Sequence, residues 1–207
     1  MAKASVNRNQ RLHFGTYHHT TPRNSEKTRQ NVKVLFKEAF SDLPFSRDDE
    51  LRILDIGCGL GFLSCFCAEH YPNAKITGFD RFEHVSLKNS SLAKAKNNAK
   101  VLGFSERIRF QKIDFFESDF SKEKFDLFVS NLVFHNFGKA RLEAYDRLAR
   151  WATPVAHIVL GDMFFDYKAD SKRLTNLFGG VQERPGPMIH KAYKIVVLSK
   201  PKKSIKD

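Results

Sequence analysis

The chain of 207 residues lacks long hydrophobic runs. No apolar stretch approaches the roughly 18–20 residues that a membrane-spanning helix needs, which excludes an integral membrane protein of the helical kind. The first ten residues are polar and basic, without the apolar segment of a secretory signal. The sequence therefore predicts a protein without membrane contacts.

Cysteine is also scarce, with three residues, Cys58, Cys65 and Cys67. This number is odd and too small for a disulfide scaffold, so it favours a reducing compartment and predicts a cytoplasmic location. Cys65 and Cys67 are two residues apart, and on a helix such residues point to different faces. Core packing is therefore predicted for them, and no metal site is predicted.

Acidic residues are few at both ends of the chain, and the formal net charge is +12. Residues 1–37 carry +7 and residues 184–207 carry +6, so the intervening segment is close to neutral at −1. Basic ends on a neutral body favour contact with an anionic partner such as RNA. Lysine-rich ends that only aid solubility are the alternative.

Apolar segments alternate with helical patterns through most of the chain. A helix capped by Asn24 or Ser25 and running to about Phe40 is predicted first. The strands and helices expected after it are 52–56, 60–71 (helix), 75–79, 86–102 (helix), 108–113, 125–130, 139–151 (helix), 157–161, 168–178 (helix), 181–183 and 192–198. Such alternation predicts an α/β fold with a doubly wound, mostly parallel sheet of seven strands, and the last two strands lie close enough to form an antiparallel hairpin.

The domain organisation that follows is one domain over residues 1–207, of a length suited to one core. Within it we expect an N-terminal arm over 1–24 and a leading helix with its linker over 25–50. The catalytic core is expected over 51–199 and a basic tail over 200–207.

A glycine-rich turn follows the first predicted strand and runs directly into a helix. Its sequence is Asp55-Ile56-Gly57-Cys58-Gly59-Leu60-Gly61. Glycines allow a tight turn and a close approach of the backbone to a ligand, and the helix that follows offers free N–H groups. Asp80 ends the next strand, where a carboxylate accepts hydrogen bonds from ribose hydroxyls. Together these features predict a site for a nucleoside-containing cofactor.

Two residues discriminate between cofactor classes. A dinucleotide-binding turn needs Gly or Ala at the position of Phe62. Asp55 adds an acid before the turn, which suits a ligand with a positive charge there. A nicotinamide-dependent oxidoreductase is therefore disfavoured.

At this point the chain resembles the class I S-adenosylmethionine-dependent methyltransferases, whose first motif is D/E-x-G-x-G-x-G. The resemblance covers about Leu51 to Ser199. It implies a Rossmann-like methyltransferase fold and S-adenosyl-L-methionine as the cofactor. The usual Lys-Pro-Gly-Gly before the fifth strand is replaced here by Trp151-Ala152-Thr153-Pro154-Val155, a departure that affects a loop.

The resemblance also implies roles for individual residues. Asp55 holds the turn or the ammonium group of the cofactor, Asp80 binds the ribose and Arg81 lies beside the adenine. Asp114 accepts from the adenine amine while Phe115 packs on the ring. The cofactor-binding set implied in this way is Asp55, Gly57, Cys58, Gly59, Gly61, Asp80, Arg81, Asp114, Phe115 and Asn131.

The segment Asn131-Leu132-Val133-Phe134-His135 follows the fourth strand, where cofactor sulfur and substrate meet in this family. His135 is the titratable candidate for a base, which methyl transfer needs only if the nucleophile carries a proton. A histidine that caps the next helix or packs beneath the site is the structural alternative. Methyltransferases that act on exocyclic amines of bases carry Asn/Asp-Pro-Pro-Tyr/Phe here, so the sequence argues against that chemistry.

Substrate contacts are predicted for Tyr17, His18 and Phe134. Tyr17 and His18 would belong to a lid, because the family commonly folds its N-terminal segment over the site. Phe134 is one of several phenylalanines after strand ends, where ligands bind in such sheets.

The function predicted from these features is methyl transfer from S-adenosyl-L-methionine to a small molecule or a protein. The first alternative is an RNA methyltransferase (for tRNA or rRNA) that holds the nucleic acid with its basic termini. The second, from another class, is a non-catalytic binding scaffold, which the intact set of acids and glycines disfavours.

Overall fold

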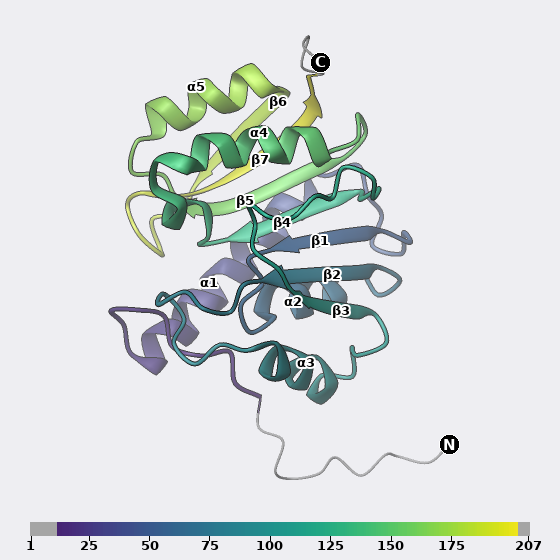
Figure 1. Ribbon diagram of the computed structural model, residues 1–207, viewed down its shortest axis with the longest axis vertical. Coiled ribbons are helices and arrows are strands. Elements are labelled where there is room, and N and C mark those ends of the chain that lie inside the picture. Colours follow the sequence, from purple (N-terminus) through teal and green to yellow (C-terminus); the bar gives the residue numbers. More distant parts are fainter. Residues whose placement is uncertain (1–11, 203–207) are drawn as a thin grey trace.

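The computed structural model describes residues 12–202, which form a seven-stranded sheet with helices on both faces (Figure 1). The parts of the predicted arm and basic tail at residues 1–11 and 203–207 lie outside the described residues. The helices are α1 (Pro22–Ser41), α2 (Phe62–His70), α3 (Leu92–Val101), a 3-10 helix η1 (Phe134–Ala140), α4 (Arg141–Trp151) and α5 (Tyr167–Leu177). The strands are β1 (Arg52–Ile56), β2 (Lys75–Asp80), β3 (Ile108–Lys112), β4 (Leu127–Asn131), β5 (His157–Met163), β6 (Phe178–Pro185) and β7 (Tyr193–Pro201).

The strand order is β3-β2-β1-β4-β5-β7-β6, and the pairs from β3 through β5 are parallel. β7 pairs antiparallel with both β5 and β6, so the predicted hairpin is present and its second strand inserts into the sheet. The order reverses between β1 and β4. Ligands bind in α/β sheets at such a switch point, beyond the carboxyl ends of the strands.

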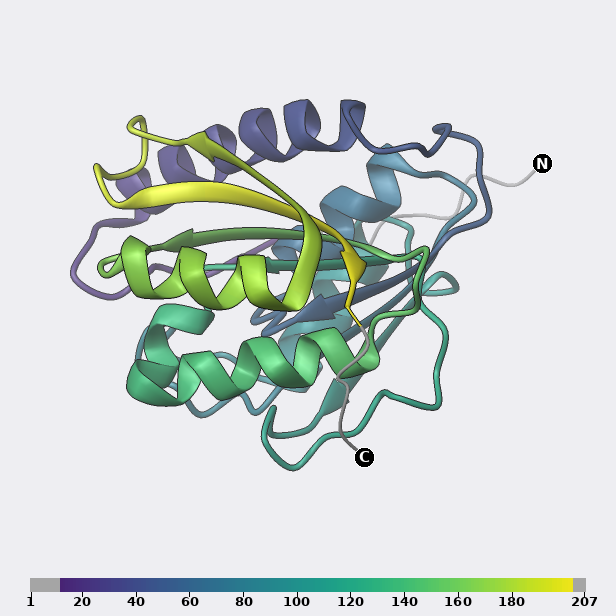
Figure 2. The same ribbon diagram turned by 90° about the horizontal axis from the view of Figure 1, so that it is seen from above.

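Two hydrophobic layers cover the sheet (Figure 2). One contains the apolar faces of α1, α2 and α3, and the other contains those of α4 and α5. The central strands β1 and β4 are buried along nearly their whole length, as expected for parallel strands covered on both sides. Cys65 and Cys67 lie in the first layer as free thiols, in agreement with their predicted core packing.

Helix starts are where the sequence prediction was least accurate. α1 begins at Pro22, and its N-cap is Thr21 in place of the predicted Asn24 or Ser25. Thr21 Oγ1 accepts a hydrogen bond from the amide of Asn24 at 3.2 Å, and proline is well suited to the first helical position. α2 begins at Phe62 because Gly61 has a φ of +79°, outside the helical region.

The predicted helix over 86–102 begins six residues later, at Leu92. Residues 86 and 87 instead pair with the N-terminal segment: Tyr17 and Leu87 form an antiparallel bridge, and the amide of His18 donates to the carbonyl of Ser86 at 2.9 Å. The helix over 139–151 begins at Arg141 after η1, and the strand predicted over 181–183 extends from Phe178 to Pro185. The late start of α3 and the longer β6 follow from tertiary pairing, which overrides local propensity, whereas the non-helical Gly138 at φ +56° precedes the start of α4.

Candidate functional site

A cavity of about 780 Å³ opens at the carboxyl ends of β1, β2 and β4. This volume is within the range of about 300–1,000 Å³ typical of ligand sites. Its lining includes ten of the predicted site residues: Tyr17, His18, Asp55, Gly57, Cys58, Gly59, Asp80, Arg81, Asp114 and Phe115. Asn131 and His135 line it as well. The structure therefore brings most of the predicted residues to one space.

The glycine turn is built as its composition requires. Gly57 and Gly59 have φ of +67° and +51°, which side chains rarely permit. A Cβ at Gly57 would lie 2.4 Å from Val133, so the turn packs directly under the segment after β4. Gly61 does not line the cavity; a Cβ there would lie 2.7 Å from the Phe110 ring. Its role in this structure is to start α2 and to pack against β3.

Asp80 fastens the turn to the end of β2. Its Oδ2 accepts from the amide of Gly59 at 3.0 Å and its Oδ1 from the amide of Phe82 at 2.6 Å. A carboxylate has about four lone-pair sites, so acceptor capacity remains toward the cavity. The arrangement is chemically suited to a ligand with a vicinal diol, as the ribose of a nucleoside presents.

The acid after β3, Asp114, forms an ion pair with Arg81. Asp114 Oδ2 lies 3.3 Å from a guanidinium nitrogen of Arg81, and its Oδ1 accepts from the amide of Phe116 at 2.8 Å. Phe115 beside it is 5% exposed and packs against Phe79 and Trp151. The end of the cavity at β2 and β3 thus combines charged groups with an aromatic wall.

Asp55 is buried at the end of β1. The hydroxyl of Ser64 donates to its Oδ2 at 2.5 Å, which ties β1 to α2. Burial raises the pKa of Asp55 to about 7, against a smaller lowering by the Ser64 hydrogen bond. Because Asp55 is 1% exposed, holding the turn is the predicted role that its contacts match.

Cys58 lies in the turn with its thiol against the backbone. Its Sγ is 3.9 Å from the carbonyl oxygen of Gly59. Burial, with the nearby charges of Asp55 and Asp80, raises the pKa of the thiol well above its ordinary value. The thiol is therefore neutral and suited to lining a wall, not to acting as a nucleophile.

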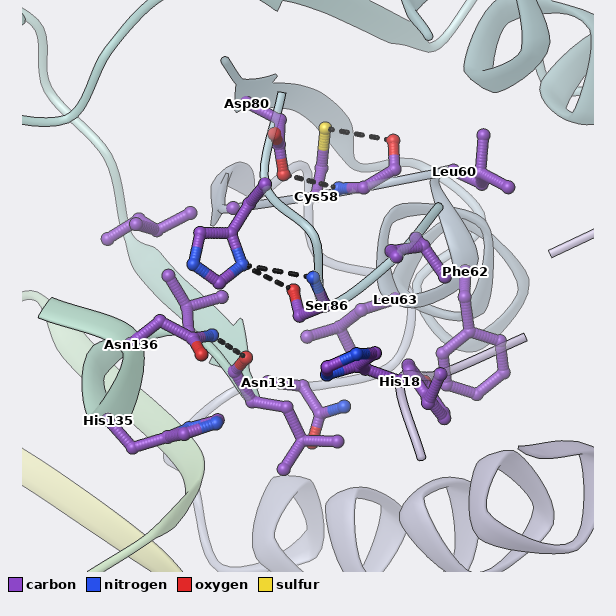
Figure 3. A pocket seen from close by; sticks show the side chains of 18 of the residues that line it. His18, Cys58, Leu60, Phe62, Leu63, Asp80, Ser86, Asn131, His135 and Asn136 are labelled. Atoms are coloured by element: carbon purple, nitrogen blue, oxygen red, sulfur yellow. Dashed lines mark hydrogen bonds between the residues drawn. The ribbon is translucent and has the colours of Figure 1, made fainter. Parts of the chain in front are cut away.

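The far side of the cavity is formed after β4 and β5. Figure 3 shows Asp80 on one side of the pocket and Asn131 with His135 on the other. Asn131 Oδ1 accepts from the hydroxyl of Tyr193 at 2.7 Å, so its side chain is fixed by β7. Leu132 follows with a φ of +59°, and this turn re-aims the chain toward the cavity.

A residue that sequence reasoning missed, Asp162, holds His135 in place. Asp162 is 2% exposed, near the end of β5, and its Oδ1 contacts Nδ1 of His135. The amides of Val133, Phe134 and His135 donate to its Oδ2 at 3.2, 2.6 and 3.3 Å. A carboxylate only accepts, so the pair assigns the proton of neutral His135 to Nδ1 and leaves Nε2 as an acceptor. The sequence does show an acid near the end of the fifth strand. Its partner His135 lies 27 residues earlier, however, and no local spacing links the two.

Phe134 is the predicted site residue that the structure places elsewhere. It is 1% exposed, is absent from the cavity lining and stacks on Tyr145 with centroids 5.4 Å apart. The three amides bound by Asp162 begin η1 at this residue and turn its ring into the α4 layer. The predicted substrate contact at Phe134 is therefore corrected to a core position, and His135 takes the place at the cavity.

The N-terminal strap, residues 12–20, closes another side. The Arg29 guanidinium donates to the carbonyls of Gly15 at 3.0 Å and Phe14 at 3.4 Å. The Oδ1 atom of Asn98 accepts a hydrogen bond from the amide of His13 at 3.1 Å, and its Nδ2 donates one to the carbonyl of His13 at 2.9 Å. These contacts hold the strap over the glycine turn, with Tyr17 and His18 in the lining.

Residues 47–192 match a family model described as a methyltransferase domain. Among curated proteins, the chain is 32% identical over 108 residues to the tRNA1(Val) (adenine(37)-N6)-methyltransferase of Vibrio cholerae, which covers 52% of the chain and 42% of that protein. It is 36% identical over 109 residues to the release factor glutamine methyltransferase of Chlorobaculum tepidum, covering 50% and 35%. The chain thus spans less than half the length of these relatives.

Solved structures share the fold at low sequence identity. The complex of human N-acetylserotonin methyltransferase with S-adenosylmethionine has a TM-score of 0.60 at 19% identity, covering 86% of the chain and 57% of that structure. A precorrin-6Y C5,15-methyltransferase from Geobacter metallireducens has a TM-score of 0.59 at 18% identity, covering 83% and 88%.

Proposed function

We propose, from the premise that the chain belongs to the class I S-adenosylmethionine-dependent methyltransferase family, that it transfers a methyl group from S-adenosyl-L-methionine to a small-molecule or protein acceptor. The observation that carries the proposal is the single cavity that joins Asp80 and the glycine turn to His135. The bound cofactor supplies an electrophilic methyl group on a sulfonium.

The residues at β1, β2 and β3 fit this cofactor. Asp80 has free acceptor capacity for the ribose hydroxyls, and Asp114 with the Phe115 wall suits an adenine ring. Asp80 supplies a carboxylate beside a turn that has to accommodate a cationic ligand, while buried Asp55, bonded to Ser64, holds β1 to α2 beneath it. Arg81 keeps Asp114 paired at 3.3 Å, so this acid is held toward one side of the cavity.

At the other end, His135 and Asp162 act as a base and the residue that positions it. Nε2 of His135 takes the proton of an acceptor hydroxyl while the oxygen forms its bond to the methyl carbon and the carbon–sulfur bond breaks. Asp162 holds the ring through Nδ1 and stabilises the resulting imidazolium. An acceptor with a protonated nucleophile, such as a hydroxyl, is the class that uses this pair.

RNA acceptors modified at exocyclic amines fit less well, although curated relatives carry names of tRNA and rRNA methyltransferases. The aromatic position that would stack a base is Phe134, and its ring is in the core. The segment lacks the two prolines after Asn131. RNA modified at another atom remains the second candidate, favoured by the basic ends of the chain.

The location is inferred from the cysteines. Cys58, Cys65 and Cys67 are buried free thiols, as expected in a reducing compartment, and we assign the protein to the cytoplasm. Within residues 12–202, none of the helices has the length and apolar character to cross a bilayer.

Two measurements test the proposed function. Calorimetry should show S-adenosylmethionine binding, and its absence would remove the cofactor assignment. Transfer of a labelled methyl group into a cell extract, followed by separate RNase and protease digestion, should leave the label in small molecules or protein. Label released by RNase would select the RNA alternative, and steep loss of that activity with salt would support it.

A further inference from the structure

The cavity has two ends that differ in charge. The cofactor end lies at β1, β2 and β3. The acceptor end is formed by His135 and Asn136, by α1, and by Met163, Met188 and Ile189. The two ends are separated by the sheet order, because α1 packs on β5 and β7, whereas Asp80 ends β2 and Asp114 follows β3.

One face of α1 forms a polar wall at the acceptor end. Asn24, Lys27, Thr28 and Asn31 are spaced by three, one and three residues, which places them on one helix face, and all four line the cavity. The opposite face of α1 carries its buried apolar residues. A polar face toward a cavity, in a helix whose other face is core, provides hydrogen-bonding groups for a ligand.

The wall is joined to an apolar rim. Asn31 Nδ2 donates to the carbonyl of Met188 at 3.0 Å, which attaches α1 to the β6–β7 connection. Met188 is 54% exposed and Ile189 lies beside it in the lining. An acceptor in this space meets thioether and aliphatic surface on one side and the polar face of α1 on the other.

The acids that line the cavity all lie at the cofactor end: they are Asp55, Asp80 and Asp114. Glu26, on the same helix as Lys27, is outside the lining and pairs with Arg29 at 3.0 Å. Asp162 is occupied by His135 and backbone amides. Within the part of the chain that the structure describes, the acceptor end therefore has Lys27 as its charged group and no carboxylate in its lining.

The strap adds two histidines to this end of the cavity. His18 and His19 line the cavity with their rings 3.7 Å apart. The pKa of His18 is lowered, by desolvation first and then by repulsion from His19 and Lys88. The lowered pKa favours neutral His18, so the positive charge at the acceptor end is that of Lys27, which repels a cationic acceptor and attracts an anionic one.

We propose that the acceptor is a small hydroxylated molecule that carries a carboxylate or another anionic group, bound by Lys27 while its hydroxyl faces His135. This inference rests on the proposed methyl transfer and specifies its substrate class. The oxygen–methyl bond would form at the hydroxyl as the methyl–sulfur bond of S-adenosylmethionine breaks and its electron pair passes to sulfur, which leaves as the thioether S-adenosylhomocysteine. The hydroxyl proton passes to Nε2 of His135, and the anionic group remains unmodified in the product.

The test uses the full chain, labelled S-adenosylmethionine and a low-mass extract of microbial cells. The labelled product should bind an anion exchanger at pH 8 and should keep its label in mild alkali, since an ether resists conditions that cleave a methyl ester. Label in a cationic or neutral product, in an alkali-labile ester, or only in macromolecules would overturn the inference. So would the absence of any labelled product from a protein that binds the cofactor.

Variants then connect the charge preference to Lys27. Lys27→Gln should reduce labelling at a limiting amount of extract by about 3–10-fold, because the side chain is exposed and its attraction is partly screened. A large excess of extract should restore the rate, as for a change in KM alone. Lys37→Gln, an exposed lysine of α1 outside the cavity lining, is the control and should change neither rate.

An equal effect of both variants would contradict the inference. Calorimetric cofactor binding is measured in parallel for each protein. Loss of that binding in the unmodified chain would refute the proposed function itself, whereas intact binding with a cationic product would refute only the acceptor class.

Discussion

The two ends of the cavity are built in different ways. At the cofactor end each functional acid stands at or just beyond the carboxyl end of a strand: Asp55 in β1, Asp80 as the last residue of β2, and Asp114 two residues after β3. At the acceptor end the lining comes from the strap, α1, the β4 connection and the β6–β7 connection, which are far apart in the sequence. The first end is fixed by the sheet, and the second depends on how separate segments are held together.

The charges differ accordingly. The cofactor end holds acids at the ends of strands, which suits a cationic ligand of fixed shape. The acceptor end holds Lys27, polar side chains and an apolar rim. If this division is functional, changes at one end should alter binding of the cofactor and changes at the other should alter turnover.

The largest effect is expected from His135→Ala. Removing a general base lowers the rate by about 10²–10⁴-fold. S-adenosylmethionine affinity by calorimetry should stay within about twofold of the unmodified protein, because the ring lies at the acceptor end. His13→Ala, an exposed histidine outside the lining, serves as the control.

The Asp162→Asn variant tests whether Asp162 positions His135 for catalysis or only supports the start of η1. Asn can still accept from the amides of η1 but leaves the His135 tautomer unfixed. The pH profile of turnover should shift with the rate, whereas loss of rate at an unchanged profile would indicate a structural role alone. Full turnover of the methyl acceptor by His135→Ala would show that His135 is not the general base and that the acceptor end does not contribute to the chemical step in this way.

A smaller effect, of about 10–100-fold, is expected on cofactor affinity in Asp80→Ala. The substitution removes a charged hydrogen-bond acceptor worth about 1.5–3 kcal/mol. Calorimetry of S-adenosylmethionine binding measures it, with Asp48→Ala at an exposed site as the control. Unchanged affinity for S-adenosylmethionine would show that the cofactor does not bind at Asp80. The assignment of this end of the cavity to the cofactor would then be wrong.

Asp55 predicts a pH effect on stability at the cofactor end. Its pKa is about 7 in the folded protein and near 3.8 when unfolded, so the folded state binds more protons between these values. Stability is therefore lost as pH rises through that window. When the pH is raised from 5 to 8, the unfolding free energy should fall in both proteins. The fall should be smaller in Asp55→Asn than in the unmodified chain, by about 2–3 kcal/mol.

Urea unfolding at the two pH values measures this difference. Asp48→Asn should show the same pH dependence as the unmodified chain. An Asp55→Asn protein with unaltered pH dependence would mean that the buried carboxyl does not titrate in this range.

The smallest effect is expected at the strap. Arg29→Gln removes the guanidinium bonds to the Phe14 and Gly15 carbonyls. Chymotrypsin should then cleave at Phe14 or Tyr17 about 2–5-fold faster, since a hydrogen bond within a protein contributes about 0.5–1.5 kcal/mol to stability. Arg23→Gln, exposed on the same helix, is the control. Equal cleavage of both variants would show that Arg29 does not hold the strap closed.

The sequence by itself determined the strand–helix alternation, the glycine turn and the acids at the carboxyl ends of β1, β2 and β3. These features are local, because a parallel strand followed by a turn places its next residue at the same edge of the sheet whatever the rest of the chain does. Both ends of β1 were predicted correctly, at residues 52 and 56. A short apolar strand that lies between a polar segment and a glycine turn has clear limits in the sequence.

Only the tertiary structure decided which residues meet at the acceptor end. Asp162 and His135, Tyr193 and Asn131, and Arg29 and Gly15 are pairs separated by many residues, and no spacing rule links them. The same holds for Phe134, whose ring is turned into the core by the carboxylate of Asp162. The late start of α3 has the same cause, because residues 86–87 pair with a strap nearly seventy residues earlier. Long-range contacts of this kind are selected by packing and hydrogen bonding in the folded chain, which local sequence patterns do not record.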